Sequence, residues 1–282
     1  MLFDAHNHLH FAALAPHLGR VFVDLRAIDL RGAVVNGTCE EEWPAVSALA
    51  REQAWIVPSY GVHPWDAGNR SHGWQATLRS RLVAESASHV GEIGLDRRII
   101  DDLSPDDPRI AGLRVAPLAE QAEVFSWQLA LAAELNRAAS IHCLRAIGPL
   151  HEILRASPRP ARGFLLHAYN GPRELVEPLA ALGAYFSYNG RYLHARHEAK
   201  NRAFLAVPLD RLLVETDAPA MELTAAHERF KLPASAEGQR VNHPANLVAA
   251  YAGLAALRRL PLEELITQVA RNFARLFGEA RG

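Results

Sequence analysis

The sequence predicts an α/β fold of the (β/α)8 or TIM-barrel type, formed as a single domain over residues 1–282. Three observations support this prediction. Short apolar runs alternate with longer helical stretches from end to end, a pattern that favours parallel strands joined by right-handed crossovers. Eight such runs can be counted, and a barrel of this type needs about 250 residues, which the chain provides. An open doubly wound sheet would show the same alternation, and counting strands alone does not exclude it.

The predicted strands and helices follow one another in order along the chain. The clearest helix covers residues 118–135, where Leu118, Ala122, Phe125 and Leu129 recur at three or four positions. Residues 173–182 and 244–257 show similar spacing. The predicted strands are residues 2–5, 33–36, 55–60, 89–93, 139–141, 163–166, 184–187 and 211–215.

One segment, residues 97–116, breaks this rhythm, and we interpret it as a long loop after the fourth strand. Long loops in compact domains often carry function, although a solvated insertion explains the segment equally well. Its acidic and proline residues are Asp101, Asp102, Pro105, Asp106, Asp107 and Pro108.

Composition excludes several classes of protein. With 30 basic and 31 acidic residues the chain has no excess charge for a broad surface that tracks duplex nucleic acid. Cys39 and Cys143 are the only cysteines, which excludes a disulfide framework and a cysteine-rich zinc site and fits a reducing cytosol. The first residues lack the basic region of a signal peptide, and no apolar run reaches 18 residues. We therefore expect a cytoplasmic protein with no membrane partner.

Metal-ligating residue types stand at the ends of the predicted strands, where the active site of such a barrel lies. His6 and His8 end the first strand, and side chains two apart in a strand point to the same side. Glu92 ends the fourth strand without a neighbouring cation, so a metal is its simplest partner. Each of these residues alone is better explained as an ordinary buried polar group, but together they predict a metal site. The full set is His6, His8, Glu92, His142, His167 and Asp217.

Two further residues at strand ends leave a choice open. Glu215 and Asp217 share a face if the eighth strand is regular, and we take Asp217 as the ligand and general base because it stands at the strand terminus. His63 follows the third strand, either as a catalytic group or as a histidine bonded to the backbone.

Short motifs at the strand ends and near the C-terminus follow one another along nearly the whole chain. They are DAHNHLH at 4–10, GVHPW at 61–65, GEIGLD at 91–96, IHC at 141–143, HAYNG at 167–171, ETDAP at 215–219, NHP at 242–244 and NFARLF at 272–277. With these motifs the chain resembles the TatD-type metal-dependent deoxyribonucleases of the amidohydrolase superfamily. It departs from them at His10, where the family usually has Asp, and at Leu144, where the family usually has Arg, with Arg145 one step further on. The segment 98–118 matches poorly.

This resemblance implies a role for each matching position. One divalent metal would be held by His6, His8, Glu92 and Asp217, and a second by Glu92, His142 and His167, with Glu92 bridging the two. His63 would lie near the scissile group. Nitrogen and oxygen ligands suit Zn or Mn, whereas the family is associated with Mg. Anionic substrate would be bound by the candidates Arg97, Arg98 and Arg145.

Three hypotheses for function follow. The first is a two-metal phosphodiesterase or deoxyribonuclease that acts on nucleic-acid ends as a 3′-5′ exonuclease, or on a small phosphoester. In it Asp217 takes the proton of the attacking water, and Glu92 and His63 complete the catalytic set. The second is an amide, ester or aminoacyl-tRNA ester hydrolase on the same scaffold, and the third is a non-catalytic metal-binding protein. A monomer is the favoured assembly.

Overall fold

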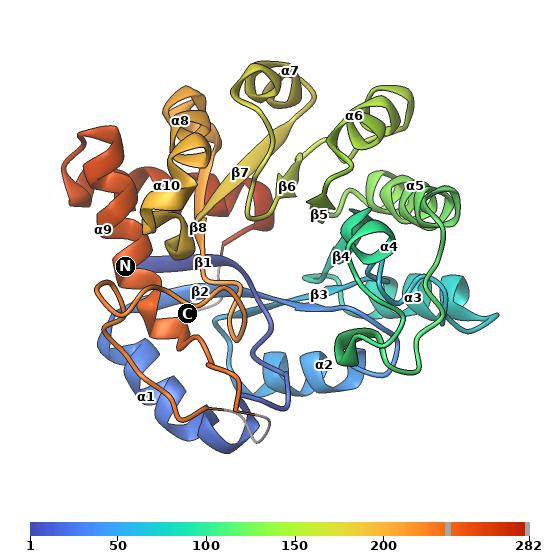
Figure 1. The fold of residues 1–282 in the computed structure, drawn as a ribbon, viewed down its shortest axis with the longest axis horizontal. Helices are drawn as coiled ribbons and strands as arrows, with labels where there is room; N and C mark the ends of the chain where they lie inside the picture. Colours follow the sequence, from blue (N-terminus) through green and yellow to red (C-terminus); the bar gives the residue numbers. More distant parts are fainter. Residues whose placement is uncertain (235–237, 280–282) are drawn as a thin grey trace.

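The computed structural model describes residues 1–234 and 238–279. Eight parallel strands form one sheet in the order β1-β2-β3-β4-β5-β6-β7-β8. Two backbone hydrogen bonds next to the strand ends join the last strand to the first: His8 N–H donates to the Ala218 carbonyl at 2.8 Å, and Asp217 N–H donates to the His6 carbonyl at 2.9 Å. The sheet is thereby a nearly closed barrel surrounded by helices (Figure 1), which confirms the predicted (β/α)8 fold.

All eight predicted strands are present, with ends that differ by a few residues from the expected ones. The strands are β1 (Leu2–Asn7), β2 (Leu30–Gly37), β3 (Ile56–Tyr60), β4 (His89–Asp96), β5 (Ala139–Leu144), β6 (Phe164–Leu166), β7 (Ala184–Asn189) and β8 (Leu212–Glu215).

Ten α-helices lie around the barrel in the described part of the chain, and six of them are the single α-helix between two consecutive strands. The helices are α1 (Leu18–Ala27), α2 (Trp43–Glu52), α3 (Trp74–Ala84), α4 (Arg98–Asp101), α5 (Leu118–Glu134), α6 (Ile147–Ala156), α7 (Val176–Ala181), α8 (Glu198–Ala206), α9 (Leu247–Arg258) and α10 (Leu262–Phe277). Short 3₁₀ turns lie between them, including η2 (Pro108–Ile110), η3 (Arg173–Leu175), η4 (Gly190–Leu193) and η7 (Pro244–Asn246).

The apolar core lies mainly between the strands and the outer helices. Trp43 of α2, Phe125 of α5 and Phe273 of α10 are completely buried there. Inside the barrel, space is tight below the strand ends. A Cβ atom on Gly91 would lie 2.7 Å from the Ser140 side chain and 2.9 Å from Asn36 Oδ1, so only glycine fits just before Glu92.

The structure refines three helical predictions. The segment 118–135 is helix α5, as predicted. Residues 173–182 begin as the 3₁₀ turn η3 before α7, and residues 244–257 begin as η7 before α9. In both cases a proline stands at or just before the first turn, and its missing N–H suits a helix start.

The prediction of a loop over 97–116 was wrong in part, because this segment contains helix α4 and the turn η2. A side-chain cap starts α4: Asp96 Oδ1 accepts hydrogen bonds from the backbone N–H groups of Arg98 at 2.8 Å and Ile99 at 3.3 Å. Ile99 and Ile110 are buried and hold the segment against the barrel. The many acidic and proline residues of the segment indicated a loop, so its two buried isoleucines were not recognised as core residues.

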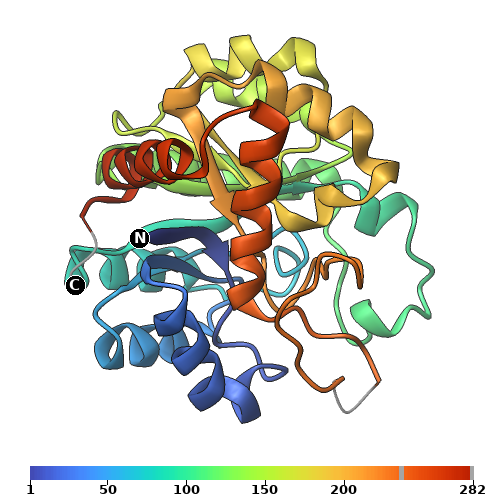
Figure 2. The same cartoon turned by 90° about the vertical axis from the view of Figure 1, so that its left-hand side faces the viewer.

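Long segments follow β4 and β8, and both project on the same side of the molecule (Figure 2). That side is where the parallel strands end. Among the described residues no helix has the length and apolar character needed to span a membrane.

Candidate metal centre

His6 and His8 at the end of β1 place their Nε2 atoms 3.3 Å apart, and both side chains are buried. The opposite ring nitrogens have other partners. His8 Nδ1 donates to the Asn36 carbonyl at 2.7 Å, and His6 Nδ1 lies 2.7 Å from Ser140 Oγ. The proton on His8 Nδ1 leaves a lone pair on its Nε2, as a metal ligand needs. His6 Nδ1 also lies 3.1 Å from the Asn36 amide nitrogen, so two polar groups fix the position of this ring.

Two carboxylates complete this first group. Glu92 Oε2 lies 3.4 Å from His6 Nε2 and 3.3 Å from His8 Nε2. Asp217 Oδ1 lies 3.7 Å and 3.3 Å from the same two atoms. Two ring nitrogens facing each other together with two carboxylate oxygens form a buried donor set that fits a divalent cation.

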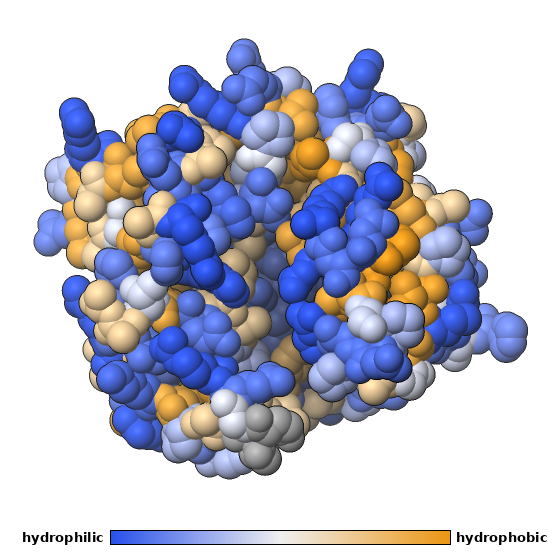
Figure 3. Space-filling model, viewed as in Figure 1, coloured by the Kyte–Doolittle hydropathy of each residue, from blue (hydrophilic) through white to orange (hydrophobic). Residues whose placement is uncertain are grey.

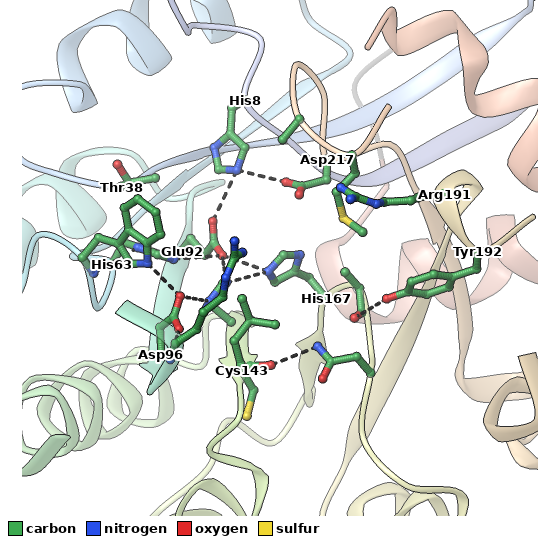
Figure 4. Close-up of a pocket in the computed structure, with 18 of the residues that line it drawn as sticks. His8, Thr38, His63, Glu92, Asp96, Cys143, His167, Arg191, Tyr192 and Asp217 are labelled. Atoms are coloured by element: carbon green, nitrogen blue, oxygen red, sulfur yellow. Dashed lines mark hydrogen bonds and ion pairs between the residues drawn. The ribbon is translucent and has the colours of Figure 1, made fainter. Parts of the chain in front are cut away.

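The other oxygen of Glu92 faces a second group. Glu92 Oε1 lies 2.9 Å from His142 Nδ1 and 2.9 Å from His167 Nε2. These two histidine nitrogens are 3.2 Å apart, so they too form a compact donor set with Oε1. His63 Nε2 is further from this oxygen, at 3.5 Å. Figure 4 shows Glu92 between His8 and Asp217 on one side and His63 and His167 on the other.

Buried carboxylates lie behind both histidines of the second group. Asp96 Oδ2 lies 3.1 Å from His142 Nε2 and accepts a hydrogen bond from Trp65 Nε1 at 2.7 Å. Glu215 Oε1 lies 3.7 Å from His167 Nδ1. A carboxylate hydrogen-bonded to the far ring nitrogen fixes the tautomer of a histidine and raises its basicity. Asp96 is close enough to do this for His142, whereas Glu215 acts on His167 only through its charge.

Charges in the cluster keep its carboxylates ionised. Burial by itself would raise the pKa of Glu92, but the surrounding histidines hold it well below its usual range. The pKa of Asp217 is likewise lowered, against the effect of burial, mainly by His8. Burial opposes the charged form of His8, yet Asp217 and Glu92 raise its pKa to about 10. Metal binding requires unprotonated histidine, so loading this site would release protons.

A cavity of about 530 Å³ opens above these groups, in the central hollow of the face drawn in Figure 3. Of the three arginines proposed to bind substrate, Arg98 lines this cavity. Arg97 is exposed and pairs with Asp101 at 2.8 Å, and Arg145 is exposed and pairs with Asp102. The structure therefore brings Arg98 to the site and directs the other two to carboxylates on the surface.

The family position occupied by His10 lies beside the metal-ligating group. His10 Nε2 is 3.1 Å from Glu42 Oε2, which also accepts hydrogen bonds from the Thr38 backbone and hydroxyl. His10 thus faces away from Glu92.

Sequence reasoning missed three residues that line this cavity. Asp96 stands at the end of β4, so its position at a strand end was the available signal. Glu215, which was weighed beside Asp217, lies behind His167 instead. Arg191 and Lys200 also line the cavity, from η4 and α8. No strand-end pattern points to them, because both lie in the connection that follows β7.

Comparison with known proteins agrees with the fold and the composition of this site. Residues 3–278 match the family described as TatD related DNase. The 3′-5′ ssDNA/RNA exonuclease TatD of Erwinia tasmaniensis is 30% identical over 98% of this chain and 99% of its own length. The metal-dependent hydrolase YabD of Bacillus subtilis is 28% identical over 98% of this chain and 99% of its own length.

A solved structure is also similar over nearly the whole chain. The crystal structure of YjjV, a TatD homologue from Escherichia coli K12, superposes with a TM-score of 0.82 at 26% identity and covers 98% of this chain and 97% of that one. Fold, donor groups and sequence comparison agree, and the chain belongs to the TatD-related DNase family of metal-dependent hydrolases.

Proposed function

We propose that this protein is a two-metal phosphodiesterase that removes nucleotides from the ends of single-stranded nucleic acid. The observation that carries the proposal is the position of Glu92, whose two carboxylate oxygens each face a separate group of ligands. In this assignment His6, His8, Glu92 and Asp217 hold one cation, and Glu92, His142 and His167 hold the other. Cations bound there would act as Lewis acids on the phosphoryl oxygens and lower the pKa of the attacking water.

The chain's own residues would perform the proton transfers. Asp217 is buried with a lowered pKa, so it is ionised and able to accept the proton of the attacking water. His63 Nδ1 accepts a hydrogen bond from the Trp65 backbone N–H at 3.2 Å, which places the ring proton on Nε2. Nε2 faces the cavity side of Glu92, where an N–H group can donate to the scissile phosphate or to the leaving oxygen.

Arg98 is the arginine that we assign to substrate binding. It lines the cavity from the first turn of α4, and the cap that Asp96 provides fixes the start of that helix. We expect Arg98→Ala to raise the KM for an oligonucleotide. Arg97→Ala and Arg145→Ala serve as matched controls and should leave KM near the wild-type value, because both side chains pair with surface aspartates. Equal effects of all three substitutions would contradict the assignment.

The shape of the site favours chain ends. The cavity is concave and holds about 530 Å³, room for a terminal nucleotide rather than for a duplex. Duplex binding depends on many phosphate contacts over a basic surface, and the chain carries 30 basic and 31 acidic residues. The exonuclease TatD of Erwinia tasmaniensis, whose name gives such an activity, is similar over its full length.

The experiment that tests this function compares end-labelled single strands, linear duplex and closed circular plasmid with Mg, Mn or Zn. We expect a stepwise ladder from one end of the single strand and slow attack on the duplex. Elemental analysis of the same preparation should give two divalent ions per chain. Rapid nicking of the closed circle would refute action at ends. Hydrolysis of a panel of carboxylic esters without attack on phosphodiesters would instead assign the site to an ester hydrolase.

A further inference from the structure

Two cations form one wall of the cavity, on the side of β7 and α8, and neither belongs to the metal-ligating groups. Arg191 stands in η4 and Lys200 in α8, and both line the cavity. In Figure 4 the side chain of Arg191 extends into the cavity on the same side as Asp217 and Tyr192. We call Arg191 and Lys200 the cationic wall.

The cationic wall lacks a carboxylate partner. Among the residues that the structure describes, neither Arg191 nor Lys200 has an acidic oxygen within 4.0 Å. Lys200 instead lies over the ring of Tyr192, with its Nζ 4.9 Å from the ring centroid. Arg202, on the same helix as Lys200, pairs instead with Glu198 at 3.2 Å. Two partly buried cations that face a cavity without a counter-ion repel each other, and an anion from outside relieves this cost.

The positions of both cations are built into the fold. Asn189 at the end of β7 caps η4 by accepting a hydrogen bond from the Arg191 backbone N–H at 2.9 Å. The Asn189 amide also donates to Glu215 at 3.3 Å and to the Thr216 carbonyl at 3.1 Å. Arg191 is thereby tied to the barrel strand that leads to Asp217. Lys200 is fixed through its neighbour Asn201, whose amide donates to the Tyr192 carbonyl at 3.0 Å.

We propose that the cationic wall binds a second phosphate group of the substrate, next to the phosphate held at the metal-ligating groups. The protein would then prefer substrates that carry at least two phosphates in succession, such as a single-stranded oligonucleotide, over an isolated phosphodiester. This inference rests on the proposed function and adds the substrate class that the same cavity selects. The surroundings agree with it, because burial and, after it, the nearby charges of Arg191 and Arg196 lower the pKa of Lys200.

The test compares two substrates in the metal-loaded protein. One is an oligothymidylate, which has successive phosphates, and the other is bis(4-nitrophenyl) phosphate, which has a single phosphodiester. We expect the double variant Arg191→Gln/Lys200→Gln to raise the KM for the oligonucleotide by roughly tenfold to a hundredfold, as expected for lost hydrogen bonds to a charged group. Its kcat/KM for the single phosphodiester should change much less, since that substrate carries no second phosphate for the cationic wall to bind. Arg202→Gln is the matched control, because it removes a positive charge from the same helix at an exposed ion pair.

A binding measurement separates this inference from the proposed function. Fluorescence anisotropy of a labelled oligothymidylate at several salt concentrations needs no hydrolysis. The slope of log Kd against log salt should fall by about 0.7 for each phosphate contact that the double variant loses on a single strand. One outcome is that wild type fails to cleave the oligonucleotide while the double variant still binds it with a smaller salt slope than wild type. In that case the nuclease assignment fails and the phosphate-binding role of the cationic wall stands. Unchanged affinity and slope in the double variant, or an equal loss of activity on both substrates, would overturn the inference.

Discussion

His142 is oriented by Asp96: the Nε2 atom of the histidine lies 3.1 Å from Oδ2 of the carboxylate, and the other ring nitrogen faces Glu92. Burial opposes ionisation of Asp96, but contacts with His142 and Trp65 lower its pKa to about 2. The carboxylate is therefore ionised at neutral pH and holds the proton of His142 on the ring nitrogen that faces away from Glu92. Asp96 acts on the site as a positioning residue.

Asp96→Asn should weaken metal binding without unfolding the protein. The amide keeps the oxygen that caps α4, but it no longer provides the negative charge next to His142. Removing such a partner typically lowers metal affinity by about 10- to 100-fold. Titration of the metal-free variant with Zn or Mn, followed calorimetrically, gives the value. Wild-type affinity in Asp96→Asn would show that Asp96 serves only the helix cap.

His6→Ala and His8→Ala should each lower the metal content and abolish hydrolysis. Their Nε2 atoms are 3.3 Å apart and share the same two carboxylates, so loss of either removes a donor from the same group. Thermal stability in the presence of metal should also fall, because binding to the native state stabilises it. His10→Gln is the control, since His10 lies next in the same segment but faces Glu42. Full metal occupancy in both alanine variants would remove these histidines from the ligand set.

Asp217→Asn should preserve the fold and lose most of the activity. An amide oxygen still coordinates weakly, but it cannot accept a proton, and general-base catalysis typically contributes about 10²- to 10⁴-fold. The comparison to make is kcat for the single phosphodiester, together with the circular dichroism spectrum. Turnover near the wild-type rate would assign the proton transfer to another group that lines the cavity.

His89, at the start of β4, should make the folded state less stable as the pH falls. Burial lowers its pKa to about 3 from an ordinary value near 6.5. Its ring remains neutral in the fold, with Nε2 donating to the Phe277 carbonyl at 2.9 Å. Below pH 6.5 the unfolded chain takes up a proton that the folded chain does not, so the free energy of unfolding decreases by up to about 1.4 kcal/mol per pH unit from this group.

The effect of His89 is isolated by difference, because other histidines titrate in the same range. Urea unfolding of wild type and His89→Gln between pH 7 and pH 5, both without metal, gives the pH dependence of each protein. The wild type should lose more stability than the variant over this range, since glutamine does not titrate. Parallel curves for the two proteins would mean that His89 is protonated in the folded state.

The order of the strands and most of the residues that gather at the candidate metal centre could be predicted because they depend on local sequence. Strands such as β4 and β8 are buried along their whole length, since strands of a parallel barrel are buried on both faces. His167 directly follows the apolar strand β6, His6 and Glu92 lie within β1 and β4, and every strand of a barrel ends on the same face. Position along the strand therefore predicted proximity across the fold.

Only the tertiary structure decided which of the remaining charged residues belong to the site. Arg97 and Arg98 are neighbours in sequence, yet α4 turns one to Asp101 and the other to the cavity. Arg191 and Lys200 line the same cavity because η4 and α8 pack against each other, joined by the hydrogen bond from the Asn201 amide to the Tyr192 carbonyl. A strand dictates the direction of its side chains by simple alternation, so sequence is sufficient there. In the connections after the strands, direction is set by caps and contacts between distant residues, such as Asn189 with Glu215, which no local pattern encodes.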